Sequence, residues 1–263
     1  MADNEKSDPR RPSHGVSGFT PPTKVLGREA RVVRKRFYKR VSVAPVEDGF
    51  TVHLDGRGVR TPAKAPLTVP ARALAEALAA EWAAQGAEIN PSTMPLTTLA
   101  CTAIDAVAAS KPEVAAEISS YALSDLLYYR ADAPAGLVTL QSAGWDPVLA
   151  WADAELGVPL KCTTGLMPVS QSPAVADAML AALLPLGPLQ LAAMHVLTSL
   201  TGSALLALAI MRDRLSVDEA WRLAHIDESW QIERWGTDAE AEARQAGRLR
   251  TAGAAAQVLE QLR

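Results

Sequence analysis

Residues 37–62 read FYKRVSVAPVEDGFTVHLDGRGVRTP, and this stretch decides the fold class. Apolar and polar residues alternate over 37–43 and again over 50–54, which is the period-two pattern of half-buried β-strands. The Asp-Gly pairs at 48–49 and 55–56 interrupt the alternation and are typical of tight hairpin turns. The stretch therefore predicts an antiparallel β-meander. Because so small a sheet cannot bury its apolar face alone, it must pack against helices.

Downstream of the meander, the sequence indicates helices almost to its end. After Pro70, the residues Leu74, Leu78 and Trp82 follow one another at four-residue spacing and form one apolar stripe of a helix. Further helices are predicted over 97–109, 112–128, 142–156, 174–184, 189–211, 216–235 and 238–262.

The expected fold class is α+β, with a small antiparallel β-rich N-terminal domain followed by an all-helical C-terminal domain. The β-rich domain, which includes one helix, is expected to cover residues 29–96, and the helical domain residues 97–263. Residues 1–28 are polar, rich in proline and aperiodic. They are expected to form a disordered tail.

Charge is distributed unevenly along the 263-residue chain, although its net charge is only -3. Residues 1–40 carry eleven Lys or Arg and four Asp or Glu, a net charge of +7, so the remainder carries -10. A basic segment can bind nucleic acid, and a nucleic-acid-binding protein using residues 24–40 is one alternative. The segment lacks the interleaved aromatic residues on which single strands stack. We therefore favour a solvated tail that leads into an exposed strand, and expect no nucleic-acid partner.

Three further features concern the cellular location of the protein. The N-terminus has no apolar core typical of a secretory signal, and its early acidic residues argue against a transit peptide, so a cytoplasmic location is expected. Residues 178–211 contain no charged side chain, but Pro185 and several polar residues interrupt them. A buried helix is therefore expected there, and no stable membrane insertion. The two cysteines, Cys101 and Cys162, form no C-x-x-C pair and are expected to be buried and reduced.

No motif of an enzyme is found in the sequence. The sequence contains no P-loop, no glycine-rich dinucleotide-binding motif and no G-x-S-x-G nucleophile motif. His225 and Glu228 lie three residues apart and could share a metal ion, but a second ligand pair is missing, so no metal or cofactor is expected. A hydrolase that uses His195 or His225 is the enzymatic alternative, although no serine has the spacing to support it.

The most informative helix is 216–235, SVDEAWRLAHIDESWQIERW, which begins with a Ser216–Glu219 capping box. In a continuous helix, Glu228 falls in the middle of the apolar stripe, with Gln231 beside it and Asp227 farther round. That stripe comprises Val217, Trp221, Ala224, Ile232 and Trp235.

A carboxylate buried alone in such a stripe is costly, by several kcal/mol. Three explanations for Glu228 are open: a structural ion pair with Arg130 or Arg222, a contact with a partner protein on a partly exposed stripe, or a general acid or base. A similar choice applies to Trp82, which is either a core aromatic or an anchor for a partner.

Several blocks of sequence resemble the ATP12 family of F1-ATPase assembly chaperones. The similarity covers residues 34–245, and the order and spacing of the blocks make it specific. The blocks are Arg36-Phe37-Tyr38-Lys39 with Val52, Leu54-Asp55-Gly56-Arg57 and Arg60-Thr61-Pro62; Leu78 to Gln85 with Ile89, Pro91 and Met94-Pro95-Leu96-Thr97; Ser124 to Arg130; and Asp227-Glu228-Ser229-Trp230-Gln231 with Trp235-Gly236.

The resemblance implies a chaperone without catalytic chemistry or a cofactor. It implies binding of the free α subunit of F1, which is kept from aggregating until it assembles with β. The same α+β fold is implied, and the absence of a transit peptide implies a bacterial, cytoplasmic member of the family. No heptad seam or long exposed strand demands a dimer, so a monomer is expected.

The resemblance also bears on individual residues. An acidic residue before Gln231 is important in the family, and both Asp227 and Glu228 could be its counterpart, with helical geometry favouring Glu228. The tryptophan equivalent to Trp82 is associated with family function. The expected partner-binding residues are therefore Glu228, Asp227, Trp82, Gln231 and Trp235.

Overall fold

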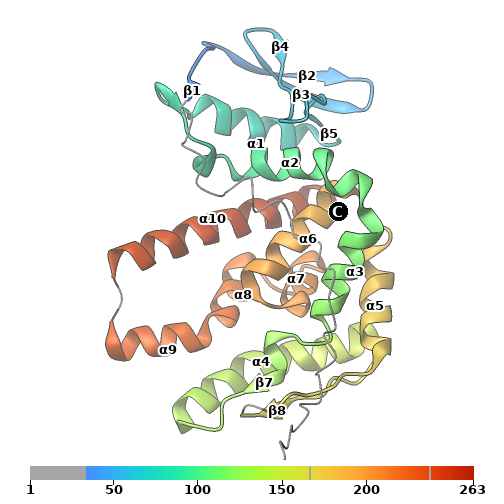
Figure 1. Cartoon of the computed structure of the whole chain (residues 1–263), viewed down its shortest axis with the longest axis vertical. Coiled ribbons are helices and arrows are strands. Elements are labelled where there is room, and N and C mark those ends of the chain that lie inside the picture. Colours follow the sequence, from blue (N-terminus) through green and yellow to red (C-terminus); the bar gives the residue numbers. More distant parts are fainter. Residues whose placement is uncertain (1–33, 166, 237) are drawn as a thin grey trace, which may run out of the picture. The chain divides into compact units, whose positions relative to one another are not determined.

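The computed structural model describes residues 34–165, 167–236 and 238–263, which belong to one compact unit (Figure 1). The predicted meander is present, because β2 (Val41–Val46), β3 (Gly49–Leu54) and β4 (Arg57–Gly58) pair antiparallel in sequence order. Two short pairings add to it. The strand β5 (Thr68–Val69) pairs with β3, and β1 (Arg34–Lys35) pairs with β6 (Glu88–Ile89). The tail expected at 1–28 lies outside the described residues.

The residues just before β2 depart from the predicted strand. The strand begins at Val41 rather than at Phe37, and Tyr38 is buried whereas Phe37 is 70% exposed, the reverse of the expected alternation. Hydrogen bonds from side chains, rather than pairing with another strand, hold this segment in place. The Asp55 carboxylate accepts hydrogen bonds from the backbone N–H groups of Lys39 and Arg40, at distances of 2.8 to 3.2 Å. The Tyr38 hydroxyl donates to the Trp82 carbonyl at 2.7 Å.

The rest of the described chain is mostly helical, and the α+β fold class is confirmed. Helix α1 (Arg72–Ala83) packs against β2, β3 and β5 (Figure 1). It is followed by α2 (Pro95–Asp105), α3 (Lys111–Tyr121), α4 (Ala135–Leu156), α5 (Pro173–Leu183), α6 (Pro188–Thr201), α7 (Ala204–Met211), α8 (Val217–Ala224), α9 (Ile226–Trp235) and α10 (Ala239–Gln261). Two short strands pair in parallel: β7 (Tyr129–Arg130), which comes between α3 and α4 in the chain, and β8 (Thr163–Thr164), which comes after α4. The domain boundary at residue 97 stays a prediction.

Two of the predicted helices are split in the structure. The helix expected over 189–211 divides at Gly202, whose φ of 68° is a left-handed conformation that glycine adopts without strain. The helix expected over 216–235 divides at His225, with φ -118° and ψ 28°. The capping box before this second break is confirmed, because Ser216 and Glu219 each accept the other's backbone N–H.

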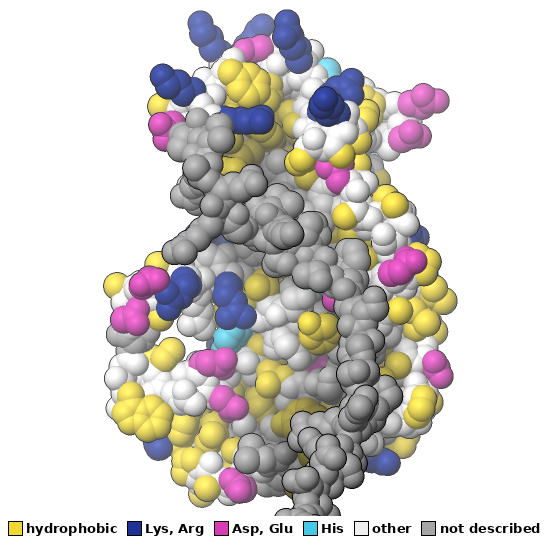
Figure 2. Space-filling view, viewed as in Figure 1, with side chains coloured by type: hydrophobic (Ala, Val, Ile, Leu, Met, Phe, Trp, Pro, Cys, Tyr) yellow, Lys and Arg dark blue, Asp and Glu magenta, His cyan; other side chains and the backbone are white. Residues whose placement is uncertain are grey.

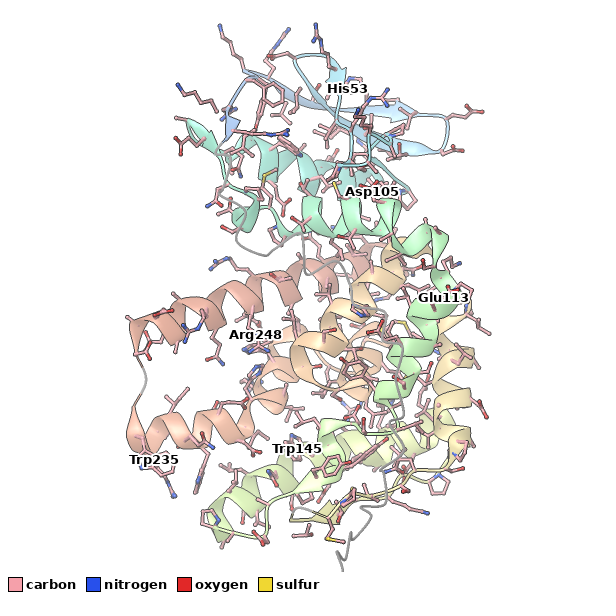
Figure 3. All side chains as sticks on the ribbon, in the orientation of Figure 1. His53, Asp105, Glu113, Trp145, Trp235 and Arg248 are labelled. Carbon is pink, nitrogen blue, oxygen red and sulfur yellow. The ribbon has the colours of Figure 1, made fainter. Side chains whose placement is uncertain are left out.

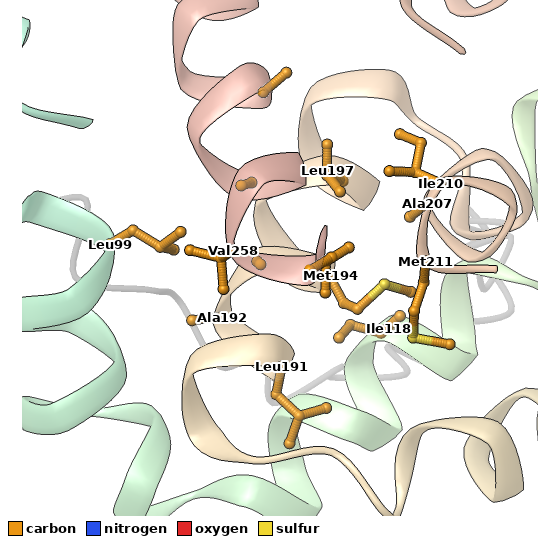
Figure 4. Close-up of a cluster of buried hydrophobic side chains, with 14 of the residues drawn as sticks. Leu99, Ile118, Leu191, Ala192, Met194, Leu197, Ala207, Ile210, Met211 and Val258 are labelled. Carbon is orange, nitrogen blue, oxygen red and sulfur yellow. The ribbon is translucent and has the colours of Figure 1, made fainter. Parts of the chain in front are cut away.

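The hydrophobic core gathers around α6 and α7. Every residue of α7 is buried, and Figure 4 shows Met194 and Leu197 of α6 near Val258 of α10. Within the charge-free segment, α7 and the buried side of α6 therefore lie in the interior of the protein, where a buried helix was predicted. Among the described helices, none is long and apolar enough to cross a membrane.

The cysteines differ from each other in their exposure. Cys101 is half-buried, and burial raises the pKa of its thiol to about 11. Cys162, which was expected to be buried, is exposed in the segment before β8. The prediction rested on the general tendency of free cysteines to be buried, which does not hold in this irregular segment outside the helices.

Helix α1 is joined to α2 by the carboxylate of Glu81. It accepts hydrogen bonds from the backbone N–H groups of Leu96 and Thr97, at 2.7 and 2.8 Å, and from the Thr97 hydroxyl at 2.7 Å. These N–H groups belong to the first turn of α2, where they have no partner within the helix. Desolvation raises the pKa of Glu81. The bonds tie the helix beside the sheet to the helical part of the chain.

A second buried carboxylate, Asp125, ties the segment after α3 to α7. Its Oδ1 accepts from the Leu127 N–H and its Oδ2 from the Leu205 N–H, both at 3.1 Å. Ser203 and Ala204 also bond to it, and the side chain is fully buried. Burial raises the pKa of Asp125 to about 6. This carboxylate is part of the block of residues 124–130 that resembles the family.

Candidate functional site

Helix α9 rests on α4 through glycines that leave room for its side chains. The ring of Trp230 occupies the space where a Cβ at Gly136 would stand, because such a Cβ would lie 2.5 Å from the ring atom Cη2. Farther along α4, a Cβ at Gly144 would lie 2.7 Å from the Leu223 side chain and 3.1 Å from the Ile226 side chain. The absence of side chains at these two glycines therefore sets how closely α8 and α9 approach α4.

Adding a methyl group at Gly136 is expected to loosen α9. In Gly136→Ala the new Cβ displaces the Trp230 ring, and overpacking of this kind costs about 1–3 kcal/mol. Amide hydrogen exchange of α9 should accelerate by about tenfold, as a loss of roughly 1.4 kcal/mol predicts. The matched control is Gly253→Ala in α10, where a Cβ would meet nothing within 4 Å. Equal exchange rates in α9 of the two variants would contradict this account.

Most of α9 is exposed, and one of its sides carries most of the residues predicted to bind a partner. Glu228, Gln231, Ile232 and Trp235 follow a spacing of i, i+3, i+4 and i+7, which places them on one side of a helix. All of them are exposed, and Trp235 is 79% exposed. Figure 3 shows Trp235 at the end of α9 that lies away from the core. We call these four residues the α9 face.

Glu228 is exposed rather than enclosed in a core-facing stripe, which agrees with the partly exposed stripe among the three explanations. The break at His225 rotates α9 relative to α8, so a helical wheel that starts at Val217 does not extend to Glu228. The stripe is buried in α8, at Trp221 and Ala224, but its continuation at Ile232 and Trp235 is exposed.

The structural ion pair considered for Glu228 is not present among the described residues. Arg130 pairs instead with Asp146, with 2.6 Å between Nη2 and Oδ1.

Asp227 points away from the α9 face, into a groove of about 640 Å³. Its Oδ1 accepts a hydrogen bond of 2.7 Å from the amide of Gln141, a buried residue of α4. The amide oxygen of Gln141 in turn accepts from the backbone N–H of Ala131, at 2.8 Å. Asp227 therefore helps to hold the first turn of α9 against α4.

Arg130, which was considered as an ion-pair partner of Glu228, lines the same groove as Asp227. Its guanidinium lies 5.1 Å from the centre of the Trp145 ring, and its Nε and Nη1 are buried without a hydrogen-bond partner among the described residues. No sequence pattern brings Arg130 to Asp227, because the two residues belong to segments that are far apart in the chain.

Trp82 lies on α1, close to the sheet, and not beside the α9 face (Figure 1). Its ring meets the buried Tyr38 ring edge-on, with 5.7 Å between centroids, and it is partly buried against the core. Its indole N–H is buried and has no hydrogen-bond partner in the part of the chain that the structure describes. Arg36 closes the C-terminal end of α1 by donating to the Ala83 and Gln85 carbonyls.

The histidines show no catalytic arrangement within the described residues. His225 is buried, with its Nδ1 2.8 Å from the Trp221 carbonyl oxygen, and the Nε2 of His195 lies 3.4 Å from Glu117. In the described part of the chain, neither has a serine or cysteine within hydrogen-bond distance. The same residues hold no cluster of three or more His, Cys, Asp or Glu that could bind a metal ion.

Comparisons with known proteins agree with this architecture. A family model described as ATP12 chaperone protein matches residues 35–153. Protein atp12, mitochondrial, from Schizosaccharomyces pombe is 24% identical over 215 residues, which cover 77% of this chain and 74% of that protein.

Two solved bacterial structures are similar over most of their length. Atp12 from Paracoccus denitrificans is 44% identical, with a TM-score of 0.81, over 88% of this chain and 99% of that one. A candidate chaperone from Agrobacterium tumefaciens is also 44% identical, with a TM-score of 0.83, over 92% of this chain and 94% of that one. The resemblance found in the sequence is thereby confirmed, and the chain belongs to the ATP12 family of F1-ATPase assembly chaperones.

Proposed function

We propose that this protein binds the free α subunit of F1 and keeps it from aggregating until it assembles with β. The observation that carries the proposal is the α9 face, which combines the exposed apolar side chains of Ile232 and Trp235 with the acid Glu228. Glu228 has no ion-pair partner among the described residues. Apolar side chains at i+4 and i+7 from an acid are typical of a helix that docks into a groove of its partner.

The chemistry of the α9 face suits a client that must later be released. An unassembled ring subunit exposes apolar interface surface, which drives aggregation unless it is covered. Two large apolar side chains supply affinity, and one carboxylate supplies orientation by pairing with a basic residue of the client. We also propose that the protein acts without catalysis or a cofactor, as a monomer in the bacterial cytoplasm.

The two neighbouring acids have different roles in this proposal. Glu228 contacts the client, whereas Asp227 positions α9 through its bond to Gln141. Gln231 contacts the client beside Glu228, and Trp82 acts from a separate surface at α1.

The direct test is retention of isolated subunits on the immobilised full-length protein. We expect the F1 α subunit to be retained and to stay in solution, and the β subunit to pass through. A result in which α is neither retained nor kept soluble would reject the proposal, and so would equal retention of both subunits.

Among single changes to the acids, Glu228→Gln is expected to weaken α binding most directly. Loss of one charged partner at an interface costs about 1.5 kcal/mol, or roughly tenfold in affinity. The fold should be unaffected because the side chain is exposed. The control is Glu233→Gln, which removes the same charge from another side of the same helix and should bind α normally. Unfolding of Glu228→Gln, or equal weakening by the control, would contradict a contact role for Glu228.

A further inference from the structure

An exposed aromatic ring stands among basic residues at the sheet end of the molecule. Phe37 is 70% exposed and lies within the sequence RKRFYKR, residues 34–40. Its ring stands nearly perpendicular to the buried Tyr38 ring, with 5.3 Å between centroids. Lys35, Lys39 and Arg40 are exposed on either side of it. We call these residues, together with the exposed Arg57, the basic face.

The segment that carries Phe37 is anchored on both sides. Before Phe37, the Arg36 guanidinium donates to backbone carbonyls at the end of α1. After it, the Asp55 carboxylate accepts from the N–H groups of Lys39 and Arg40, and the Arg40 carbonyl accepts from the Asp55 N–H at 2.9 Å. These bonds hold the ring of Phe37 in solvent although its burial would be favourable. A large apolar side chain fixed in this way is available to an apolar partner without any rearrangement of the backbone.

The charge around Phe37 limits what that contact can be. Residues 34–64 carry eight Lys or Arg and three Asp or Glu, a net charge of +5, although the whole chain is at -3. Figure 2 shows the Lys and Arg side chains gathered at this end of the molecule. Of the nearby acids, Asp55 is occupied by backbone N–H groups, and Glu88 stands opposite Lys35 in the β1–β6 pair. A partner of this face must therefore be anionic and also offer an apolar layer.

We propose that the basic face docks reversibly on an anionic lipid membrane, with Phe37 entering the headgroup region and the surrounding cations contacting lipid phosphates. A membrane presents anionic groups and hydrocarbon within a few ångströms of each other, and a flanked aromatic residue is suited to that boundary. A single-stranded nucleic acid would stack on several aromatic rings, but Tyr38, the neighbour of Phe37, is buried. The proposal does not depend on which F1 subunit is the client.

Sedimentation with lipid vesicles tests the proposal on the full-length protein. We expect it to sediment with vesicles that contain phosphatidylglycerol and not with vesicles of phosphatidylcholine alone, and binding should fall as salt is added. The double variant Lys39→Gln/Arg40→Gln should lower the apparent affinity by roughly twenty-fivefold, at about fivefold for each cation. Phe37→Ala should lower it by about tenfold, because an inserted apolar side chain is lost.

Matched variants elsewhere on the surface separate this face from a general effect of charge. Lys161→Gln/Arg214→Gln removes two exposed cations from the helical part, and Leu184→Ala removes an apolar side chain that is 61% exposed. Neither should change vesicle binding. If the protein fails to sediment with anionic vesicles at low salt, the proposal is overturned. It is also overturned if the control variants lose as much vesicle affinity as the variants of the basic face. Tighter binding to a single-stranded oligonucleotide, combined with unchanged vesicle binding of Phe37→Ala, also overturns it and assigns the face to nucleic acid.

Discussion

Replacing Asp125 with alanine is expected to lower the free energy of unfolding by about 3–5 kcal/mol, because each buried donor left without a partner costs about 1–3 kcal/mol. The variant leaves the backbone N–H groups of Leu127 and Leu205 without an acceptor, because in the wild type both donate hydrogen bonds of 3.1 Å to this carboxylate. It also removes the connection between the segment after α3 and the start of α7. The midpoint of thermal unfolding should fall by roughly 10 °C for a chain of this length.

The cost of Asp125→Ala should depend on pH. The pKa of Asp125 is about 6 in the folded protein, above its ordinary value of 3.8, so the folded state binds the proton more tightly than the unfolded state. The corresponding stabilisation is complete below the ordinary pKa and is lost as pH rises through 6. The difference in stability between the wild type and the variant should therefore increase by about 1 kcal/mol when the pH is lowered from 7.5 to 5.

Denaturant unfolding at several pH values measures this effect, and Asp125→Asn is the control. Asparagine keeps one acceptor oxygen and does not titrate, so it should be less harmful than alanine, and its difference from alanine should be independent of pH. A difference between the wild type and Asp125→Ala that shrinks towards pH 5 would show that the carboxylate is favoured in its charged form, against the expectation.

The largest expected effect on client binding is that of Trp235→Ala. Tryptophan is enriched among the residues that dominate interfaces, and its truncation there costs at least about 2 kcal/mol, or roughly thirtyfold in affinity. Because Trp235 is 79% exposed in the free protein, the variant should keep its stability within about 0.5 kcal/mol. Titration of the α subunit, together with thermal unfolding, measures the two quantities separately.

Leu184→Ala serves as the control for Trp235→Ala. Leu184 is 61% exposed, at the end of α5, and its removal also reduces exposed apolar surface. Its affinity for α should equal that of the wild type. An unchanged affinity in Trp235→Ala, at unchanged stability, would place the client surface elsewhere than the α9 face.

The fold class could be predicted from the sequence because its patterns are local. The alternation predicted over 37–43 and 50–54 agrees, from Val41 onward, with the antiparallel register of β2 and β3, in which Val43 is paired with Val52. The capping box at Ser216 and Glu219 depends on two residues within one turn and is present. Helix α7 lies in the core because its residues are apolar on every side.

The candidate site could be predicted only in part, because it depends on contacts between distant segments. The block around Glu228 was identified, but its place in the core-facing stripe of one continuous helix was wrong, since a break of one residue at His225 changes every later position on a helical wheel. The docking of Trp230 onto Gly136 pairs two residues that no periodicity connects. The inward turn of Tyr38 depends in the same way on the Trp82 carbonyl, which lies 44 positions along the chain.

The packing of α10 has a consequence for folding during synthesis. This helix, with Val258 and Leu259 buried, covers α6 and also contacts α2 (Figure 1). While the ribosome has translated only as far as α7, the side of α6 that α10 will cover is exposed, and exposed apolar surface of a nascent polypeptide favours aggregation. The core closes only after α10 has left the exit tunnel, so this chaperone completes its own fold late in translation.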